Sequence, residues 1–279
     1  MKHIFLLTLA VTINSLQPVT AYAEQALRPL WEVGAGIAVL SFPDYRGSDE
    51  QRQFVLPIPY VVYRGETLQI DRQKVRGLLF KRGQTELDIS INGSVPVHSD
   101  KNKARAGMPN LDPTLEIGPQ LNYLFFDNDR QRLRLQVPLR SVEAVEHSHL
   151  RNVGWMVNPM LNLDIKNTGP EGGWNLGISG GPIWADARYH DYYYSVAPQY
   201  ATADRPAYDG RGGYSGAHLT LSMSRRYPKM WVGGFVRVND VHGSAFEDSP
   251  LMKRKSGFMA GIGISWMLAQ SDKLTLSDE

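Results

Sequence analysis

Alternating apolar and polar residues run through most of this chain, and the stretch nearest the C-terminus shows the pattern most clearly. In residues 257–266, Phe258, Ala260, Ile262, Ile264 and Trp266 fall on one face. The other face carries only glycine, serine and one methionine. A period of two residues predicts a strand. An apolar face that ends in an aromatic residue is typical of a strand with lipid outside and a polar lumen inside.

The same alternation recurs in about twelve segments separated by turn-forming residues. We predict strands at 31–42, 53–63, 67–72, 75–80, 84–92, 114–126, around 132–140, 152–165, 174–187, around 218–224, 231–238 and 257–266. Pro57 and Pro59 lie inside the second strand. Because proline cannot donate to a sheet ladder, we expect a bulge or a bend there.

The connections between these segments alternate in length. Those after the second, fourth, sixth, eighth and tenth strands are short, whereas those after the first, fifth, seventh, ninth and eleventh are longer. We therefore predict an all-β fold, a transmembrane antiparallel β-barrel of about 12 strands with short periplasmic turns and longer extracellular loops. A soluble periplasmic β-sandwich is the alternative, but it would not be required to alternate its loop lengths.

Charged and amide residues occupy one face of several predicted strands. Arg132, Arg134 and Arg140 share a face of the seventh strand, opposite a row of leucines and a valine. Such side chains need water or partners, which a barrel lumen provides. The candidate lumen residues are Glu86, Asp88, Glu116, Arg132, Arg134, Arg140, Asp164 and His218.

The N-terminus is typical of an exported protein. A short basic start, the apolar run 4–13 and the sequence Ala21-Tyr22-Ala23 indicate a Sec-type signal peptide over residues 1–23, cleaved after Ala23. We assign residues 24–268 to the barrel and residues 269–279 to a polar C-terminal tail. We expect this tail to be disordered in the periplasm.

Composition narrows the function classes. The formal net charge is +2 and the arginines are scattered, so no basic field for nucleic acid is indicated. The chain contains no cysteine, which excludes disulfides, thiol catalysis and cysteine-ligated metals. The mean hydropathy of −0.31 would also suit a soluble protein, but alternation hides the hydrophobicity of a barrel from such an average. We predict no cofactor.

Two short motifs resemble a known family. The loop after the first strand has the pattern P-D-Y-x-G-S-D, and a D-S-P-L element lies shortly before the last strand. Both resemble elements of the MipA/OmpV family, the MltA-interacting outer-membrane proteins. The residues that carry this resemblance are Pro43, Asp44, Tyr45, Gly47, Ser48, Asp49, Asp248, Ser249, Pro250 and Leu251. An Asx-type turn explains the first motif without a ligand, and we favour that structural interpretation.

The resemblance implies a protein of the outer membrane of a Gram-negative bacterium, in contact with outer-membrane lipid. It also implies a non-enzymatic scaffold for murein (peptidoglycan) enzymes, namely the lytic transglycosylase MltA and a murein synthase. Other members are described as porin-like proteins or surface antigens. A passive diffusion channel is therefore our alternative hypothesis, and an outer-leaflet enzyme is the third.

Catalytic and metal-binding patterns are weak. Glu146, His147 and His149 form a candidate divalent metal site, but without a third ligand in fixed geometry we interpret these histidines as solvated. His190 beside Asp191 resembles the rim residues of omptin proteases, without a second aspartate pair. His218 and Ser222 lie four residues apart on one strand, about 13 Å from each other, which is too far for a catalytic hydrogen bond. We therefore predict no catalytic residues and no metal site.

Overall fold

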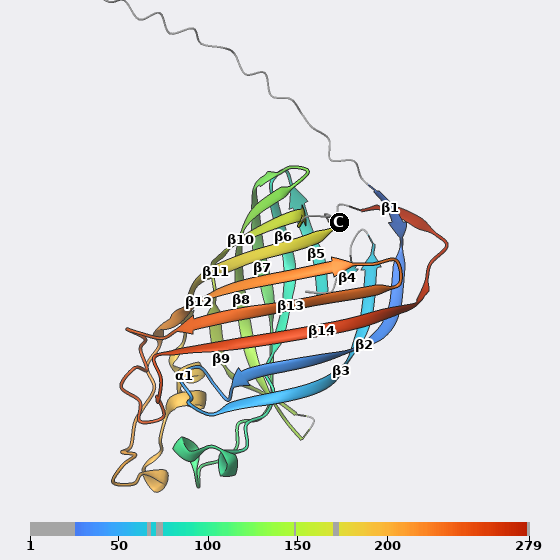
Figure 1. Ribbon diagram of the computed structural model, residues 1–279. Coiled ribbons are helices and arrows are strands. Elements are labelled where there is room, and N and C mark those ends of the chain that lie inside the picture. The colour runs from blue at the N-terminus through green and yellow to red at the C-terminus, as the bar shows by residue number, and fades with distance from the viewer. Residues whose placement is uncertain (1–25, 66–67, 71–74, 148, 170–172, 278–279) are drawn as a thin grey trace, which may run out of the picture.

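The computed structural model describes residues 26–65, 68–70, 75–147, 149–169 and 173–277 (Figure 1). Nearly all of its regular structure is antiparallel strand. The strands are β1 (Ala26–Pro29), β2 (Trp31–Pro43), β3 (Gln51–Arg64), β4 (Leu68–Ile70), β5 (Val75–Arg82), β6 (Thr85–Gly93), β7 (Thr114–Asp127), β8 (Gln131–Glu146), β9 (His149–Val157), β10 (Met160–Thr168), β11 (Trp174–Ala185), β12 (Gly213–Arg226), β13 (Met230–Asp240), β14 (Ser256–Gln270) and β15 (Leu274–Ser277). The helices are α1 (Ala187–Tyr194), η1 (Ser99–Lys101), η2 (Lys103–Arg105) and η3 (Pro198–Tyr200). The predicted signal peptide lies outside the described residues.

Strands β2 to β14 form one closed sheet, a barrel. Its 13 strands run in the order β10-β11-β12-β13-β14-β2-β3-β4-β5-β6-β7-β8-β9. β8 pairs with β9 along one half of its length and with β10 along the other, so β9 and β10 share one position in the wall. The barrel therefore has twelve strand positions, and the prediction of about 12 strands is confirmed. None of the described helices is long and apolar enough to cross a membrane.

The last barrel strand has the two faces that its sequence predicts. On β14, Phe258, Ile262 and Trp266 are 52, 69 and 47 % exposed, and they point out of the barrel. Gly261 and Ser265 on the opposite face are buried in the lumen. The outer surface is thus apolar where lipid would contact it.

The two prolines of β3 cause neither a bulge nor a register shift, so the bulge that the sequence analysis gave as one of two outcomes is absent. The β2–β3 ladder is continuous from Trp31–Tyr63 to Pro43–Gln51. The Arg64 N–H donates to the Leu30 carbonyl on the β2 side, so the N–H groups of odd-numbered residues point away from β2. On that far edge β3 pairs only through Tyr63 and Arg64 with the short β4. Pro57 and Pro59 therefore remove no ladder bond.

Two further expectations are wrong. β8 and β9 run from Gln131 to Glu146 and from His149 to Val157, so the connection after the seventh predicted strand is tight rather than long. The C-terminal tail is also not disordered over its described part, up to Ser277, because β14 extends to Gln270 and β15 pairs with β1. Together β1 and β15 continue the β14–β2 ladder past the barrel rim as a two-stranded ribbon, which we call the terminal ribbon (Figure 1).

Candidate functional site in the lumen and its loop cap

The long connections pack against one another over one end of the barrel. We call the segments 44–50, 94–113, 186–212 and 241–255 the loop cap. Its apolar core is buried, and the Tyr194 and Phe246 rings stack with centroids 3.7 Å apart. The buried core residues are Tyr45, Val97, Ala104, Leu111, Tyr194, Val196, Val241, Phe246 and Leu251. Loops that share such a core hold a fixed arrangement over the mouth of the barrel.

The two sequence motifs meet inside this cap. The Tyr45 hydroxyl donates to the Leu251 carbonyl at 2.9 Å, and the Ser249 hydroxyl donates to the Tyr194 carbonyl at 2.7 Å. The Gly47 carbonyl accepts the N–H groups of two residues just after the D-S-P-L element. Burial raises the pKa of the Tyr45 phenol, which keeps it a hydrogen-bond donor at physiological pH. The motifs therefore join loops that are about two hundred residues apart in the sequence.

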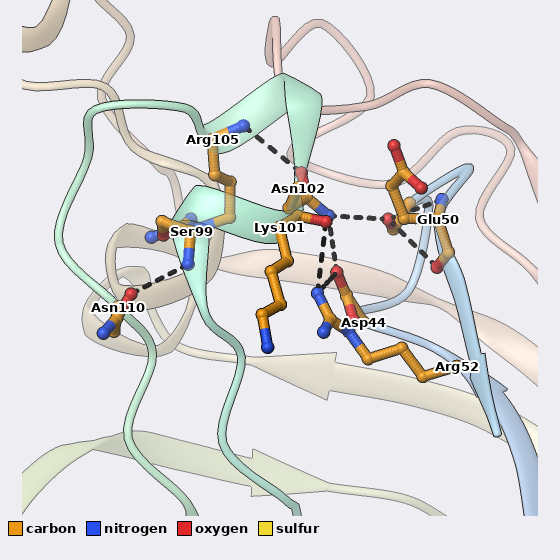
Figure 2. Close-up of polar contacts among 9 residues, drawn as sticks. Asp44, Glu50, Arg52, Ser99, Lys101, Asn102, Arg105 and Asn110 are labelled. Atoms are coloured by element: carbon orange, nitrogen blue, oxygen red, sulfur yellow. Dashed lines mark hydrogen bonds and ion pairs between the residues drawn. The ribbon is translucent and has the colours of Figure 1, made fainter. Parts of the chain in front are cut away.

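Asp44 makes the contacts that hold the 94–113 segment (Figure 2). Its carboxylate accepts hydrogen bonds from the Arg52 guanidinium, including one of 3.1 Å from Nη2, and from Asn102 Nδ2 at 2.7 Å. Asn102 also donates to the Ser48 hydroxyl, and Arg52 Nη2 donates to the Lys101 carbonyl. We call Asp44, Ser48, Arg52 and Asn102 the outer clasp. The clasp connects the β2–β3 loop to the β6–β7 loop, whose strands are separated by the β4–β5 hairpin.

The remaining motif residues have simpler positions. Pro43 is buried at the end of β2, and the Ser48 hydroxyl accepts the Glu50 N–H, as expected of a turn. Asp49 and Asp248 are exposed, and Pro250 is half-buried. Local turn chemistry thus accounts for part of the first motif. Sequence reasoning did not find that its tyrosine and first aspartate contact other loops.

The lumen candidates separate into two groups. Arg140 lies 3.3 Å from Glu116 and also donates to Ser90, while Arg134 lies 2.7 Å from Asp164. These ion pairs form inside the barrel, together with Asp88, whose carboxylate accepts from Asn122 at 3.0 Å. Two other candidates, Glu86 and Arg132, pair at the short-turn rim. Glu86 lies 3.9 Å from Lys81, and Arg132 lies 2.5 Å from Asp127.

A second ionic cluster, which the sequence analysis missed, lies near the short-turn end. The Glu32 side chain is fully buried, 2.9 Å from Arg64 and 2.8 Å from Arg226. The Tyr60 hydroxyl donates to the same carboxylate at 3.1 Å. The sequence did contain a signal for this cluster, because Glu32 is the one charged residue on the inward face of an otherwise apolar first strand. Because two arginines neutralise it, this carboxylate binds strands β2, β3 and β12 together across the lumen.

The histidine hypotheses find no support. The His190 ring is buried in the cap, where its nitrogens contact the Arg211 carbonyl and the Ser215 hydroxyl rather than Asp191. Burial lowers the pKa of His190 below its usual value. No group of three potential metal ligands occurs among the described residues, so the His147 and His149 hypothesis gains no third ligand. His218 faces the lumen without contacting Ser222, whose hydroxyl contacts the Gly177 carbonyl.

Comparison with solved structures finds other outer-membrane proteins. An outer-membrane channel from Pseudomonas putida F1 has 12 % identity and a TM-score of 0.44, with 88 % of this chain and 97 % of that chain covered. The NanC porin has 7 % identity and a TM-score of 0.38, covering 87 and 100 %. Outer membrane phospholipase A from Escherichia coli has 11 % identity and a TM-score of 0.34, covering 91 and 94 %. Similarity this low says nothing about the activity of this chain.

The sequence itself gives a clearer result. No curated protein matches it. The model of the family described as MltA-interacting protein MipA, however, matches residues 35–268. That range includes both motifs of the loop cap and the barrel sheet from Ala35 in β2 to Leu268 in β14. The chain therefore belongs to the MipA family and is an outer-membrane β-barrel.

Proposed function

We propose that this protein is a non-enzymatic anchor that holds a lytic transglycosylase of the MltA type at the periplasmic face of the outer membrane. The observation that carries the proposal is the terminal ribbon, which projects from the rim of short turns. Leu27 pairs with Leu276 and Pro29 pairs with Leu274, so these four side chains share one face. The three leucines are 52 to 62 % exposed.

This apolar face suits a protein partner. Four residue pairs extend the ribbon by about 13 Å beyond the β14–β2 ladder. Exposed leucines grouped on a short sheet are unusual on a free surface and are typical of an interaction site. The opposite face, with Arg28, Thr275 and Ser277, is polar. The family description, an MltA-interacting protein, supplies the class of partner.

The loop cap over the lumen favours the anchor function rather than a general diffusion channel. The loop cap covers one mouth with a buried apolar core, and ion pairs such as Arg134 with Asp164 line the inner wall. A passive diffusion channel remains the second candidate, because the lumen lining is polar and charged. Single-channel recording in a planar bilayer separates the two. An anchor is expected to be electrically silent, whereas steady ohmic openings would make the channel the primary function.

The docking surface is tested by substitution on the two faces of the ribbon. Purified protein in detergent is immobilised, and the retention of purified MltA-type transglycosylase is measured. The double variant Leu274→Asp/Leu276→Asp is expected to reduce retention at least about tenfold, as loss of central apolar contacts does. Thr275→Asp, on the polar face of the same strand, is the matched control and is expected to retain the enzyme. Equal retention by both variants would refute docking through this face.

A further inference from the structure

Four polar side chains form a patch on the lumen side of β12 and β13, close to the loop cap. His218 lies opposite Asn239, and Thr220 lies opposite Arg237 in the β12–β13 ladder. Directly opposed residues have Cβ atoms about 5 Å apart, so the four side chains are neighbours. His218, Thr220 and Asn239 are 8, 8 and 6 % exposed. We call these four residues the lumen patch.

The patch has more hydrogen-bonding groups than partners. His218 Nδ1 and Asn239 Nδ2 are buried, and neither has a hydrogen-bond partner among the described residues. Arg237 donates through Nε to the Thr220 hydroxyl at 2.8 Å, and no carboxylate of the described chain forms an ion pair with it. An unpaired buried amide costs about 1–3 kcal/mol, so each such group in a native protein calls for an explanation, of which a bound water, ion or ligand is one.

The charge around the patch is positive. Arg46, which enters from the loop cap, and Arg140, which enters from β8, both lie close enough to interact electrostatically with Arg237 and His218. Glu116 is the carboxylate that acts on Arg237, but it already accepts hydrogen bonds from Arg140 and Asn92. Three guanidinium groups thus share one carboxylate. Such repulsion in a poorly solvated interior is costly unless an anion is bound there.

The other half of the lumen shows what a purely structural arginine does in this barrel. Arg134 is fixed by Asp164 at 2.7 Å, and Asp164 also accepts a hydrogen bond from Asn162. Arg237 has an equivalent inward position but lacks such a partner. The difference between these two arginines therefore points to a ligand rather than to a stabilising ion pair.

We propose that the lumen patch binds the oxyanion group of a small solute, a carboxylate or a phosphate. Arg46 and Arg140, whose guanidinium groups already donate to Ser215 and Glu116, add positive charge nearby. The Arg237 guanidinium offers its two terminal nitrogens as a fork that matches two oxygens of such a group. Asn239 Nδ2 and the Nδ1–H tautomer of His218 donate to its other oxygens. The barrel wall and the loop cap separate the patch from lipid headgroups, so the bound anion is a solute of the lumen. This site is independent of the anchor function proposed above.

The test uses the full-length mature protein in a phosphate-free detergent buffer. Its heat-induced unfolding is followed by gel mobility as inorganic phosphate replaces chloride at constant ionic strength. Ligand binding to the folded state raises the unfolding midpoint in a saturable way. We expect Arg237→Gln to raise the half-maximal phosphate concentration at least about tenfold, because a charged hydrogen bond is lost. Arg134→Gln removes a lumen arginine outside the patch and is expected to leave that concentration unchanged.

A second variant keeps the test valid if Arg237→Gln does not fold. Asn239→Leu has a similar volume and leaves every arginine in place. We expect it also to raise the half-maximal phosphate concentration about tenfold, because a hydrogen bond to the anion is lost. Crystals grown with selenate, a tetrahedral anion with an anomalous signal, are expected to show a peak within hydrogen-bonding distance of Arg237 and Asn239. Absence of a saturable phosphate effect in the unsubstituted protein would overturn the proposal. The proposal would also be overturned if the patch variants and Arg134→Gln had equal half-maximal phosphate concentrations.

Discussion

Removing the Asp44 carboxylate is expected to detach the 94–113 segment from the loop cap without unfolding the barrel. The Asp44 side chain is 1 % exposed, whereas that of Arg52 is 22 % exposed. Asp44→Ala leaves both Arg52 and the buried Asn102 without their carboxylate partner. Breaking a buried ion pair costs about 3–5 kcal/mol, and the partial exposure of Arg52 lowers this to about 2–3 kcal/mol. The equilibrium for local opening then rises roughly 30- to 150-fold.

Limited proteolysis measures this opening. Lys101 and Lys103 lie in η1 and η2, beside the outer clasp, and cleavage after them requires local opening. When opening and closing are fast relative to cleavage, the cleavage rate follows the opening equilibrium. Asp44→Ala is therefore expected to be cut at these lysines roughly 30 to 150 times faster, with the heat-induced unfolding of the barrel little changed.

The matched control lies five residues further along the same loop. Asp49 belongs to the same motif but is exposed and makes no side-chain hydrogen bond among the described residues. Asp49→Ala is expected to change stability by less than about 0.5 kcal/mol and to be cleaved like the unsubstituted protein. If Asp44→Ala and Asp49→Ala are cleaved at equal rates, the outer clasp does not hold the cap.

Three further predictions concern other parts of the fold. Glu32→Ala removes the buried carboxylate that Arg64 and Arg226 share, so it is expected to lower the free energy of unfolding by about 3–5 kcal/mol in denaturant titrations, with Glu32→Gln losing less. Burial lowers the pKa of His190, so this side chain binds a proton more tightly in the unfolded loop than in the folded cap. The stability of the cap is therefore complete above about pH 6.5 and falls as the pH decreases below that value. Proteolysis of the cap between about pH 5 and 8 tests this, and His190→Gln is expected to remove the dependence. Gly154 has φ +133°, and a Cβ there would lie 2.5 Å from the Tyr189 nitrogen. Gly154→Ala is thus expected to lower the free energy of unfolding by about 2 kcal/mol or more in a denaturant titration. Gly83→Ala, where nothing obstructs the new Cβ, is expected to lower it by about 1 kcal/mol.

Local pattern was sufficient for the barrel itself. Alternation on β14 identified which residues face lipid, because strand geometry sends successive side chains to opposite sides whatever the rest of the chain does. The turn residues between segments predicted the number of strands, and the arginines of β8 predicted a polar lumen. A bulge at the prolines of β3 was wrongly allowed for, because the effect of a proline depends on which neighbouring strand its nitrogen faces. That neighbour is determined by sheet order and not by the local sequence.

Contacts between distant segments were not predictable from a single sequence. The motif loops were recognised as motifs, but nothing in their spacing shows that Tyr45 reaches Leu251 or that Asp44 reaches Asn102. The ordered tail was missed for the same reason, since β15 acquires its structure only by pairing with β1.

What the sequence alone determined was therefore the barrel, its outward face and its family resemblance, each of which depends on periodicity or a short motif. What only the tertiary structure decided was which polar groups find partners. Arg134 and Arg237 are both inward-facing arginines on barrel strands, and their sequence contexts do not distinguish them. The register of the β8–β10 ladder places Asp164 diagonally beside Arg134, whereas no carboxylate of the described chain forms an ion pair with Arg237. Pairing of polar side chains on the lumen face is determined by strand order and register, and so it is a property of the sheet rather than of any one strand.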